Sequence, residues 1–316
     1  PSLPRTAMYF YIKNMTATQQ VGAMFVIVFG ILMLASITAF VLSIREQGEG
    51  EAADAKRSEL RNIDGILRTS WVMVFVFWVG WLAGDWVAIT LFALVSFFAL
   101  REFMTLSPTR RGDHRSLVLA FFVVLPVQYW LVGSEHFDLF TVFIPVYVFL
   151  AIPVVSALAN DPYRFLERNA KLQWGIMVCI YGMSHVPALL LLNFRGFQNR
   201  SAFLVFFLVL VVQTCMVVQY LASRRFKSAP AAPAISDSFA WRSWWTGVLA
   251  GSVLGGLLAG LTPFAPGQAL ALAFVACVAG SLGHLVMKAL KRDRGIPNWG
   301  RDGVSVTGAG GLLDRV

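Results

Sequence analysis

The chain has 316 residues, of which 57% are hydrophobic and 14% are charged, and its mean hydropathy is +0.67. Soluble proteins carry roughly 45–50% apolar and about 25% charged residues, so this composition excludes a soluble globular protein. A net charge of +9 would suggest nucleic-acid binding in a soluble chain. Here the basic residues flank apolar blocks, where membrane topology and anionic lipid headgroups account for them, so nucleic acid is not an expected partner.

Nine apolar blocks follow one another along the chain. Each is a candidate membrane-spanning helix, because a hydrocarbon core about 30 Å thick needs about 20 helical residues. The second and third blocks are short and joined only through Asp85, which leaves a helical hairpin and a re-entrant pair as alternatives. We therefore expect an all-α polytopic integral membrane protein with about nine transmembrane helices. The blocks span residues 21–44, 70–84, 86–100, 117–132, 139–158, 174–192, 201–222, 245–261 and 268–286.

The distribution of lysine and arginine predicts how these helices are oriented. Of the 26 basic residues, 22 lie in the five segments that follow the first, third, fifth, seventh and ninth apolar blocks. Only 4 lie in the N-terminus and the loops between the other blocks. Short cytoplasmic loops retain positive charge, so we expect the N-terminus outside and the C-terminal segment in the cytoplasm, with the chain in a bacterial inner membrane. The basic segments are residues 45–69, 101–116, 159–173, 223–244 and 287–316.

The chain divides into two predicted regions. Residues 46–61 mix both charge signs and are typical of a solvated linker. We predict an N-terminal transmembrane helix with a cytoplasmic linker in residues 1–69 and a larger membrane domain in residues 70–316. Because the chain starts at Pro1 without Met and stops at Val316 inside a motif described below, we expect a C-terminally truncated fragment.

Few ionisable residues lie inside the apolar blocks. His185 is the one ionisable residue well inside a block other than the thiols of Cys179, Cys215 and Cys277. The spacing of these cysteines indicates neither disulfides nor a zinc site. A histidine bound to a carbonyl is the ordinary interpretation of His185, and a proton relay is the alternative. Since intramembrane charge and internal repeats are both missing from the sequence, a transporter is a third and weaker interpretation of the whole chain.

Chemistry is expected at the C-terminal segment instead. Lys291 and Arg292 end the last apolar block, and a glycine-rich stretch then leads to Asp314 and Arg315. Backbone N–H groups of a glycine loop can approach phosphate oxygens closely, and basic side chains neutralise charge on phosphate. Basic residues at a membrane exit are also ordinary topological anchors, so the pattern alone does not decide.

The order of these residues resembles the signature of the phosphatidate cytidylyltransferase (CDP-diacylglycerol synthase) family. The matching elements are Lys291–Arg292, Trp299–Gly300, Gly310–Gly311 and Asp314–Arg315, and weaker similarity covers residues 98–103 and 212–220. The resemblance implies a membrane enzyme of phospholipid biosynthesis, a nucleotidyltransferase that joins CTP to phosphatidate and forms CDP-diacylglycerol and pyrophosphate. It also implies that carboxylates hold Mg²⁺ against the triphosphate while lysine and arginine stabilise the leaving pyrophosphate.

The resemblance assigns candidate roles to individual residues. Asp314 is the candidate metal ligand, and Asp314, Lys291 and Arg292 are the candidate catalytic residues. Expected partners are CTP, phosphatidate and membrane lipids, with a second copy of the chain as a candidate homodimer. The candidate substrate-binding residues are Gly308, Gly310, Gly311, Arg315, Arg224 and Arg225.

The chain departs from the family pattern at five places. Met216 and His284 stand where the family has aspartates, and residues 236–240 replace a Ser-Pro-x-Lys-Thr stretch. Asn298 replaces the aspartate of a Lys-Asp step, and Ala309 replaces a histidine. Because Mg²⁺ prefers hard oxygen ligands, two interpretations stay open. The chain is a divergent cytidylyltransferase, or it is a catalytically silent member, a pseudoenzyme, acting as a lipid-binding or regulatory subunit.

Overall fold

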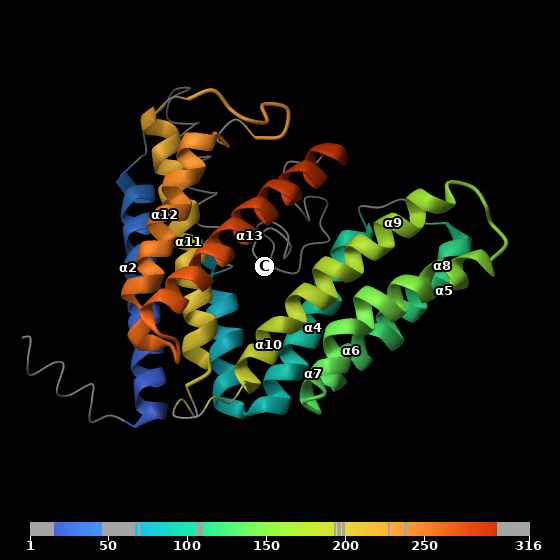
Figure 1. The fold of residues 1–316 in the computed structure, drawn as a ribbon, viewed down its shortest axis with the longest axis horizontal. Coiled ribbons are helices and arrows are strands. Elements are labelled where there is room, and N and C mark those ends of the chain that lie inside the picture. Colours follow the sequence, from blue (N-terminus) through green and yellow to red (C-terminus); the bar gives the residue numbers. More distant parts are fainter. Residues whose placement is uncertain are drawn as a thin grey trace, which may run out of the picture. The chain divides into compact units, whose positions relative to one another are not determined.

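The computed structural model describes residues 16–45, 67–68, 70–105, 110–192, 194, 197, 200–226, 228–236 and 239–295. These residues form helices and one isolated bridge between Ala232 and Ser236. They fall into two compact units (Figure 1). The first unit contains residues 192–295 with the start of the first helix, and the second contains residues 23–191. Each unit is described by itself below.

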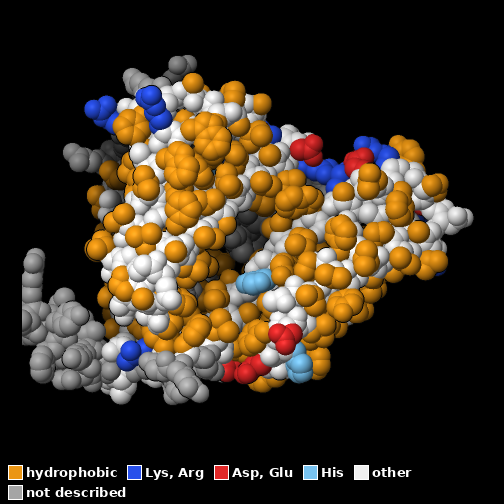
Figure 2. Space-filling view, in the orientation of Figure 1, with side chains coloured by type: hydrophobic (Ala, Val, Ile, Leu, Met, Phe, Trp, Pro, Cys, Tyr) orange, Lys and Arg blue, Asp and Glu red, His pale blue; other side chains and the backbone are white. Residues whose placement is uncertain are grey.

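The prediction of an all-α polytopic membrane protein is confirmed. Within the described residues, seven helices are long and apolar enough to cross a membrane, and hydrophobic side chains cover much of the visible surface (Figure 2). Two further helices, Ser70–Ala83 and α12 (Trp241–Leu257), match the remaining predicted blocks but are shorter. Nine crossings therefore stay a prediction. The seven spans are Thr18–Ile44, Asp85–Thr105, Arg111–Gly133, Phe137–Ala157, Phe165–Leu191, Ala202–Phe226 and Pro266–Asp293.

The first unit is a three-helix bundle of α11 (Ala202–Phe226), α12 and α13 (Pro266–Asp293). Small residues at a helix interface let backbones approach closely inside a membrane. The α12 helix places Gly247, Gly251 and Gly255 four residues apart. A Cβ atom on Gly247 would lie 2.6 Å from a backbone oxygen of α11, and Cβ atoms on the other two would collide with side chains of α13. These contacts run in opposite order along α12 and its neighbours, so α11 and α13 run in the same direction, with α13 inclined to α11 (Figure 1).

Most of the second unit is a bundle of four long helical rods. The first rod, α4, is a single α-helix, and the other three each contain a π-helical segment. The rods are α4 (Asp85–Thr105), then α5 (His114–Leu119), η2 (Ala120–Val124) and α6 (Leu125–Gly133), then α7 (Phe137–Val142), η3 (Phe143–Val148) and α8 (Phe149–Ala157), and last α9 (Phe165–Ile176), η4 (Met177–Gly182) and α10 (Met183–Leu191).

Proline explains part of this irregular geometry. Pro145 and Pro153 lie inside the third rod and lack the N–H group that would bond the carbonyl four residues earlier. The Tyr181 hydroxyl donates to the Thr141 carbonyl at 3.0 Å, and the Gln173 amide donates to the Phe149 carbonyl at 2.9 Å. Side chains of the fourth rod thus donate to both carbonyls that a proline four residues later cannot bond, and unpaired carbonyls are costly in the hydrocarbon region.

The short helix Ser70–Ala83 and α4 are joined by a tight turn, and whether this pair spans the membrane or re-enters it stays a prediction. Gly84 has a φ of 93°, which a glycine adopts without strain, and a Cβ on Gly80 would lie 3.2 Å from that of Ala88. The long N-terminal helix α2 (Ala17–Arg45) packs on the short helix through aromatic side chains. Phe25 lies 5.4 Å from Phe77 between ring centroids.

Candidate functional site

The described candidate residues of the first unit lie at one end of its bundle. Arg224 and Arg225 are in the last turn of α11, and Lys291 and Arg292 are in the last turn of α13. Because the two helices are parallel, their last turns lie at the same end of the bundle, which we call the basic end. The guanidinium carbon of Arg224 lies 4.7 Å from the centre of the Tyr220 ring. Asp314, Arg315, Gly308, Gly310 and Gly311 lie outside the described residues.

The loop between α11 and α12 folds back on the basic end. The Lys288 ammonium group on α13 donates to the Ser236 hydroxyl at 3.3 Å, and Ser236 is buried. The backbone N–H of Ala231 also donates to the carbonyl of Phe239 at 2.7 Å. The family resemblance assigns residues 236–240 to a phosphate-binding stretch, and the described Ser236 of these residues lies beside a lysine of α13.

Two of the substituted positions lie at the same level of the bundle. A Cβ atom on Gly280 of α13 would lie 2.7 Å from the side chain of Val212 on α11. Met216 and His284 each follow four residues later on these parallel helices, about one turn closer to the basic end. The two positions at which the family resemblance expects carboxylates therefore lie about one turn beyond this helix contact, with His284 exposed.

The side chains at this level do not fit a magnesium ion. Met216 offers a thioether and His284 an imidazole, whereas Mg²⁺ requires oxygen ligands in octahedral geometry. Among the residues that the structure describes, no group of three or more histidine, cysteine, aspartate or glutamate side chains is placed to hold a metal ion. Among the described charged side chains at this end, the basic residues of α11 and α13 outnumber the one carboxylate, Asp293, so this end is suited to bind phosphate.

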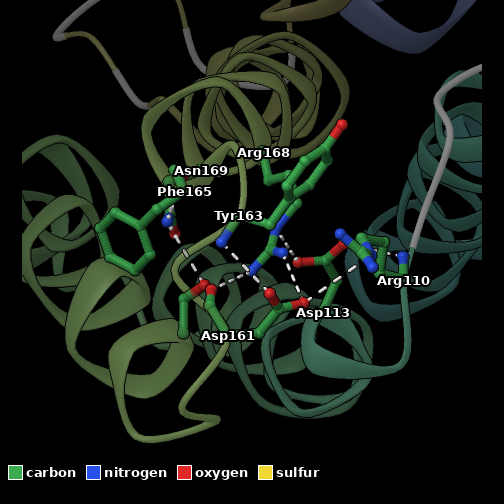
Figure 3. Close-up of polar contacts among 8 residues, drawn as sticks. Arg110, Asp113, Asp161, Tyr163, Phe165, Arg168 and Asn169 are labelled. Carbon is green, nitrogen blue, oxygen red and sulfur yellow. Dashed lines mark hydrogen bonds and ion pairs between the residues drawn. The ribbon is translucent and has the colours of Figure 1, made fainter.

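The second unit contains a polar cluster that the sequence did not predict (Figure 3). The guanidinium group of Arg168 on α9 contacts Asp113 through Nε at 2.9 Å and Asp161 through Nη1 at 2.8 Å. Its Nη2 also donates to the backbone carbonyl of Asp161 at 3.0 Å. The side chain of Arg168 is only 7% exposed. Asp113 ends the short 3₁₀ turn η1 (Arg111–Asp113), and Asp161 precedes α9, so Arg168 joins two loops.

Arg110 completes this cluster from its exposed side. Its backbone N–H donates to the Asp113 carboxylate at 2.9 Å, and its guanidinium carbon lies 4.6 Å from the centre of the Tyr163 ring. Burial raises the pKa of the Asp161 carboxyl, but the backbone N–H of Tyr163 and the Arg168 guanidinium outweigh burial and hold that pKa below its ordinary value. Both loops lie on the same side of the unit, as the charge distribution predicts for segments 101–116 and 159–173.

The two loops carry a signal that could have indicated the cluster. Arg110, Asp113, Asp161 and Arg168 lie in segments that the basic-residue pattern assigns to one side of the membrane, and opposite charges occur in both. Pairing between the two segments needs the tertiary structure, because Arg168 lies 55 positions after its partner Asp113 in the sequence. The intramembrane histidine needs less explanation. His185 Nδ1 lies 2.7 Å from the Tyr181 carbonyl, which is the ordinary bonding predicted for it.

Comparison with known proteins supports the resemblance. A family model described as "Cytidylyltransferase family" matches residues 66–316. The uncharacterized protein YnbB of Escherichia coli (strain K12) is 32% identical over 254 residues, which cover 79% of this chain and 81% of YnbB. No solved structure matches the chain at a significant level. The chain therefore belongs to the cytidylyltransferase family, of the phosphatidate cytidylyltransferase type.

Proposed function

We propose that this protein binds phosphatidate and CTP at the basic end of α11 and α13, on the cytoplasmic side of a bacterial inner membrane. We propose further that it converts them to CDP-diacylglycerol and pyrophosphate far more slowly than a family member with the full set of carboxylates. The observation that carries this proposal is the common level of Met216 and His284, where two expected carboxylates are replaced at once.

The retained residues support binding of the phosphates. In the family's reaction a phosphate oxygen of phosphatidate attacks the α-phosphorus of CTP, and the bond from that phosphorus to the bridging oxygen of pyrophosphate breaks. Arg224, Arg225, Lys291 and Arg292 end two parallel helices, where their positive charges would attract the lipid phosphate and the triphosphate. Metal-dependent activation of the attack has Asp314 as its one remaining candidate ligand in the motif, and Asp314 lies outside the described residues.

A second candidate function follows from the same observation. A family member that holds phosphatidate without turning it over would act as a lipid-binding or regulatory subunit for phospholipid enzymes, either as a single chain or as a homodimer. The glycine contacts along α12 support this alternative, because they maintain the bundle and do not depend on the replaced residues.

Incorporation of radiolabelled CTP into lipid tests the proposal. The purified full-length protein is incubated with CTP, phosphatidate and Mg²⁺ beside a family member that retains the carboxylates. Loss of one well-placed electrostatic group typically costs about 10² to 10³ in rate, so we expect at least about a hundredfold less product. Phosphatidate retention, measured by native mass spectrometry, should persist and should fall when Arg224 and Arg225 are both replaced with glutamine.

Two variants decide what a positive result would mean. Asp314→Ala removes the candidate metal ligand, and Asp85→Ala removes a carboxylate from the turn between the short helix and α4 as the matched control. Robust incorporation that Asp314→Ala abolishes and Asp85→Ala leaves intact would contradict slow turnover and establish an active enzyme. Absence of both incorporation and phosphatidate retention would contradict the proposal as a whole.

A further inference from the structure

The Arg168 cluster of the second unit leaves a surface of exposed cations around it. Arg168 pairs with both Asp113 and Asp161, and Arg110 also pairs with Asp161, so two arginines balance the two carboxylates of the cluster. The side chains of Arg110 and Arg164 remain 50% and 61% exposed. Arg111 and Arg115, on the loop before α5 and on α5, are exposed as well. Among the described residues of this surface, arginine therefore outnumbers carboxylate.

Two of these arginines are held in defined positions. The guanidinium group of Arg110 lies on the ring of Tyr163 with its Nε 3.8 Å from an Asp161 carboxylate oxygen, and the side chain remains 50% exposed. Arg164 adopts a left-handed backbone conformation with φ of 48°, which is uncommon for a residue other than glycine, and it precedes the first turn of α9. The Glu167 carboxylate contacts both Arg164 and Lys171, so one negative charge is shared between two cations.

Large apolar side chains are exposed beside these cations. Leu158, Tyr163 and Leu166 are 71%, 58% and 81% exposed. They flank the ends of two spans, Phe137–Ala157 and Phe165–Leu191, where the hydrocarbon region gives way to lipid headgroups. A soluble phosphate compound would not need leucine side chains next to its binding cations. A phospholipid would use both, because its phosphate meets the arginines while its acyl chains cover the leucines.

We propose that this surface, formed by Arg110, Arg111, Tyr163, Arg164 and Leu166, binds an anionic phospholipid of the surrounding leaflet. The lipid phosphate accepts hydrogen bonds from Arg110 and Arg164, and the first part of an acyl chain lies along Leu166. The Arg168 ion pairs are the rigid support that keeps the two loops together. This site belongs to the second unit and is independent of the proposed CTP chemistry of the first, so neither proposal depends on the other.

Photocrosslinking with defined lipids tests this site. The full-length protein is placed in phosphatidylcholine nanodiscs that contain a diazirine-labelled phosphatidylglycerol or the matching phosphatidylcholine, and labelled peptides are identified by mass spectrometry. We expect the phosphatidylglycerol probe to label residues 158–166 preferentially. Each of Arg110→Gln and Arg164→Gln should reduce this labelling about fivefold, as expected for one basic side chain at a membrane surface.

Arg242→Gln is the matched control, because Arg242 is also exposed but lies on α12 of the first unit. It should leave labelling of residues 158–166 unchanged. Labelling of the unmodified protein should also fall as ionic strength rises, which provides a measurement that needs no variant. Equal labelling by both lipids, or unchanged labelling in both arginine variants, would overturn the proposal. Complete protection by excess inorganic phosphate would also overturn it, by assigning the cations to a soluble ligand.

Discussion

Arg168 uses all three nitrogens of its guanidinium group to hold Asp113 and the side chain and backbone of Asp161. A buried charge is costly unless it is paired and hydrogen-bonded, and this arginine forms ion pairs with both aspartates and hydrogen bonds to Asp161. The bidentate fork of arginine suits this role, which a lysine could not fill with the same geometry. The cluster therefore belongs to the architecture of the second unit and also fixes the arginines around it.

The lowered pKa of Asp161 predicts a pH dependence of stability. A carboxyl whose pKa is lower in the folded state than in the unfolded state stabilises the fold above its unfolded pKa of about 3.9. That contribution is lost as the pH falls through the folded-state pKa. We expect the melting temperature of the wild type to exceed that of Asp161→Asn at pH 7, and the difference to shrink as the pH falls below about 4.

Glu135→Gln is the control for this measurement, because Glu135 is an exposed carboxyl in the loop at the end of α6. Its melting temperature should follow that of the wild type across the same pH range. A constant difference between the wild type and Asp161→Asn from pH 7 to pH 3 would show that the ion pair with Arg168 does not contribute as described.

At the scale of the element, proline and glycine set the helix geometry. Each of the last three rods of the second unit contains a π-helical segment and at least one proline, and the fourth rod donates side-chain hydrogen bonds to the third. In the first unit, glycines every fourth residue on α12 allow close contact with two neighbours. The second unit thus satisfies backbone carbonyls with side-chain hydrogen bonds, and the first unit packs its helices closely through glycines. Both arrangements suit an environment without water.

Tyr181→Phe should destabilise the second unit by removing the donor to the Thr141 carbonyl. Hydrogen bonds between membrane helices contribute about 0.6 kcal/mol on average and up to about 1.7 kcal/mol. We expect a loss in this range in the free energy of unfolding, measured by steric trapping or titration with a denaturing detergent. Tyr147→Phe is the matched control, because the Tyr147 side chain is 57% exposed.

A double-mutant cycle with Pro145→Ala tests the reason for this loss. The alanine variant regains the backbone N–H that an α-helical bond to Thr141 requires. In the Pro145→Ala background, Tyr181→Phe should therefore cost clearly less than it does in the wild type. Equal losses in both backgrounds would mean that the tyrosine hydroxyl does not compensate for the proline.

At the scale of the whole molecule, the charge distribution and the fold make a joint prediction of topology. The Arg168 cluster requires that residues 110 and 161 lie on the same side of the membrane. The excess of lysine and arginine predicts that this side is the cytoplasm and that the loop containing Glu135 is outside. Labelling of single cysteines with a membrane-impermeant maleimide, in a variant without the three natural cysteines, measures this directly.

Glu135→Cys should react with the reagent in intact cells, and Arg111→Cys should react only after the membrane is opened. Arg164→Cys, on the second loop of the cluster, serves as an internal control and should behave like Arg111→Cys. Strong labelling of Arg111→Cys in intact cells would reverse the orientation, and opposite behaviour of the two arginine positions would contradict the fold of the second unit.

The sequence by itself determined the class of this protein. Long apolar blocks can be stable only as membrane helices, so the all-α fold and the helix locations follow from composition and length. The family was likewise evident from the order of Lys291, Arg292, Gly310, Gly311 and Asp314, because a short motif is a local property of the chain. The same local information indicated which aspartates are replaced.

Only the tertiary structure decided which of these positions meet. Val212 on α11 meets Gly280 on α13, one turn before Met216 and His284, because small residues on α12 and α13 let these helices approach closely, which depends on contacts between distant residues. The sequence did not predict the partners of Arg168 for the same reason. It also did not predict the side chains that donate to the Thr141 and Phe149 carbonyls. Helix formation is decided within a few turns of one segment, whereas pairing depends on the relative depth and rotation of helices, which hydrophobicity alone does not specify.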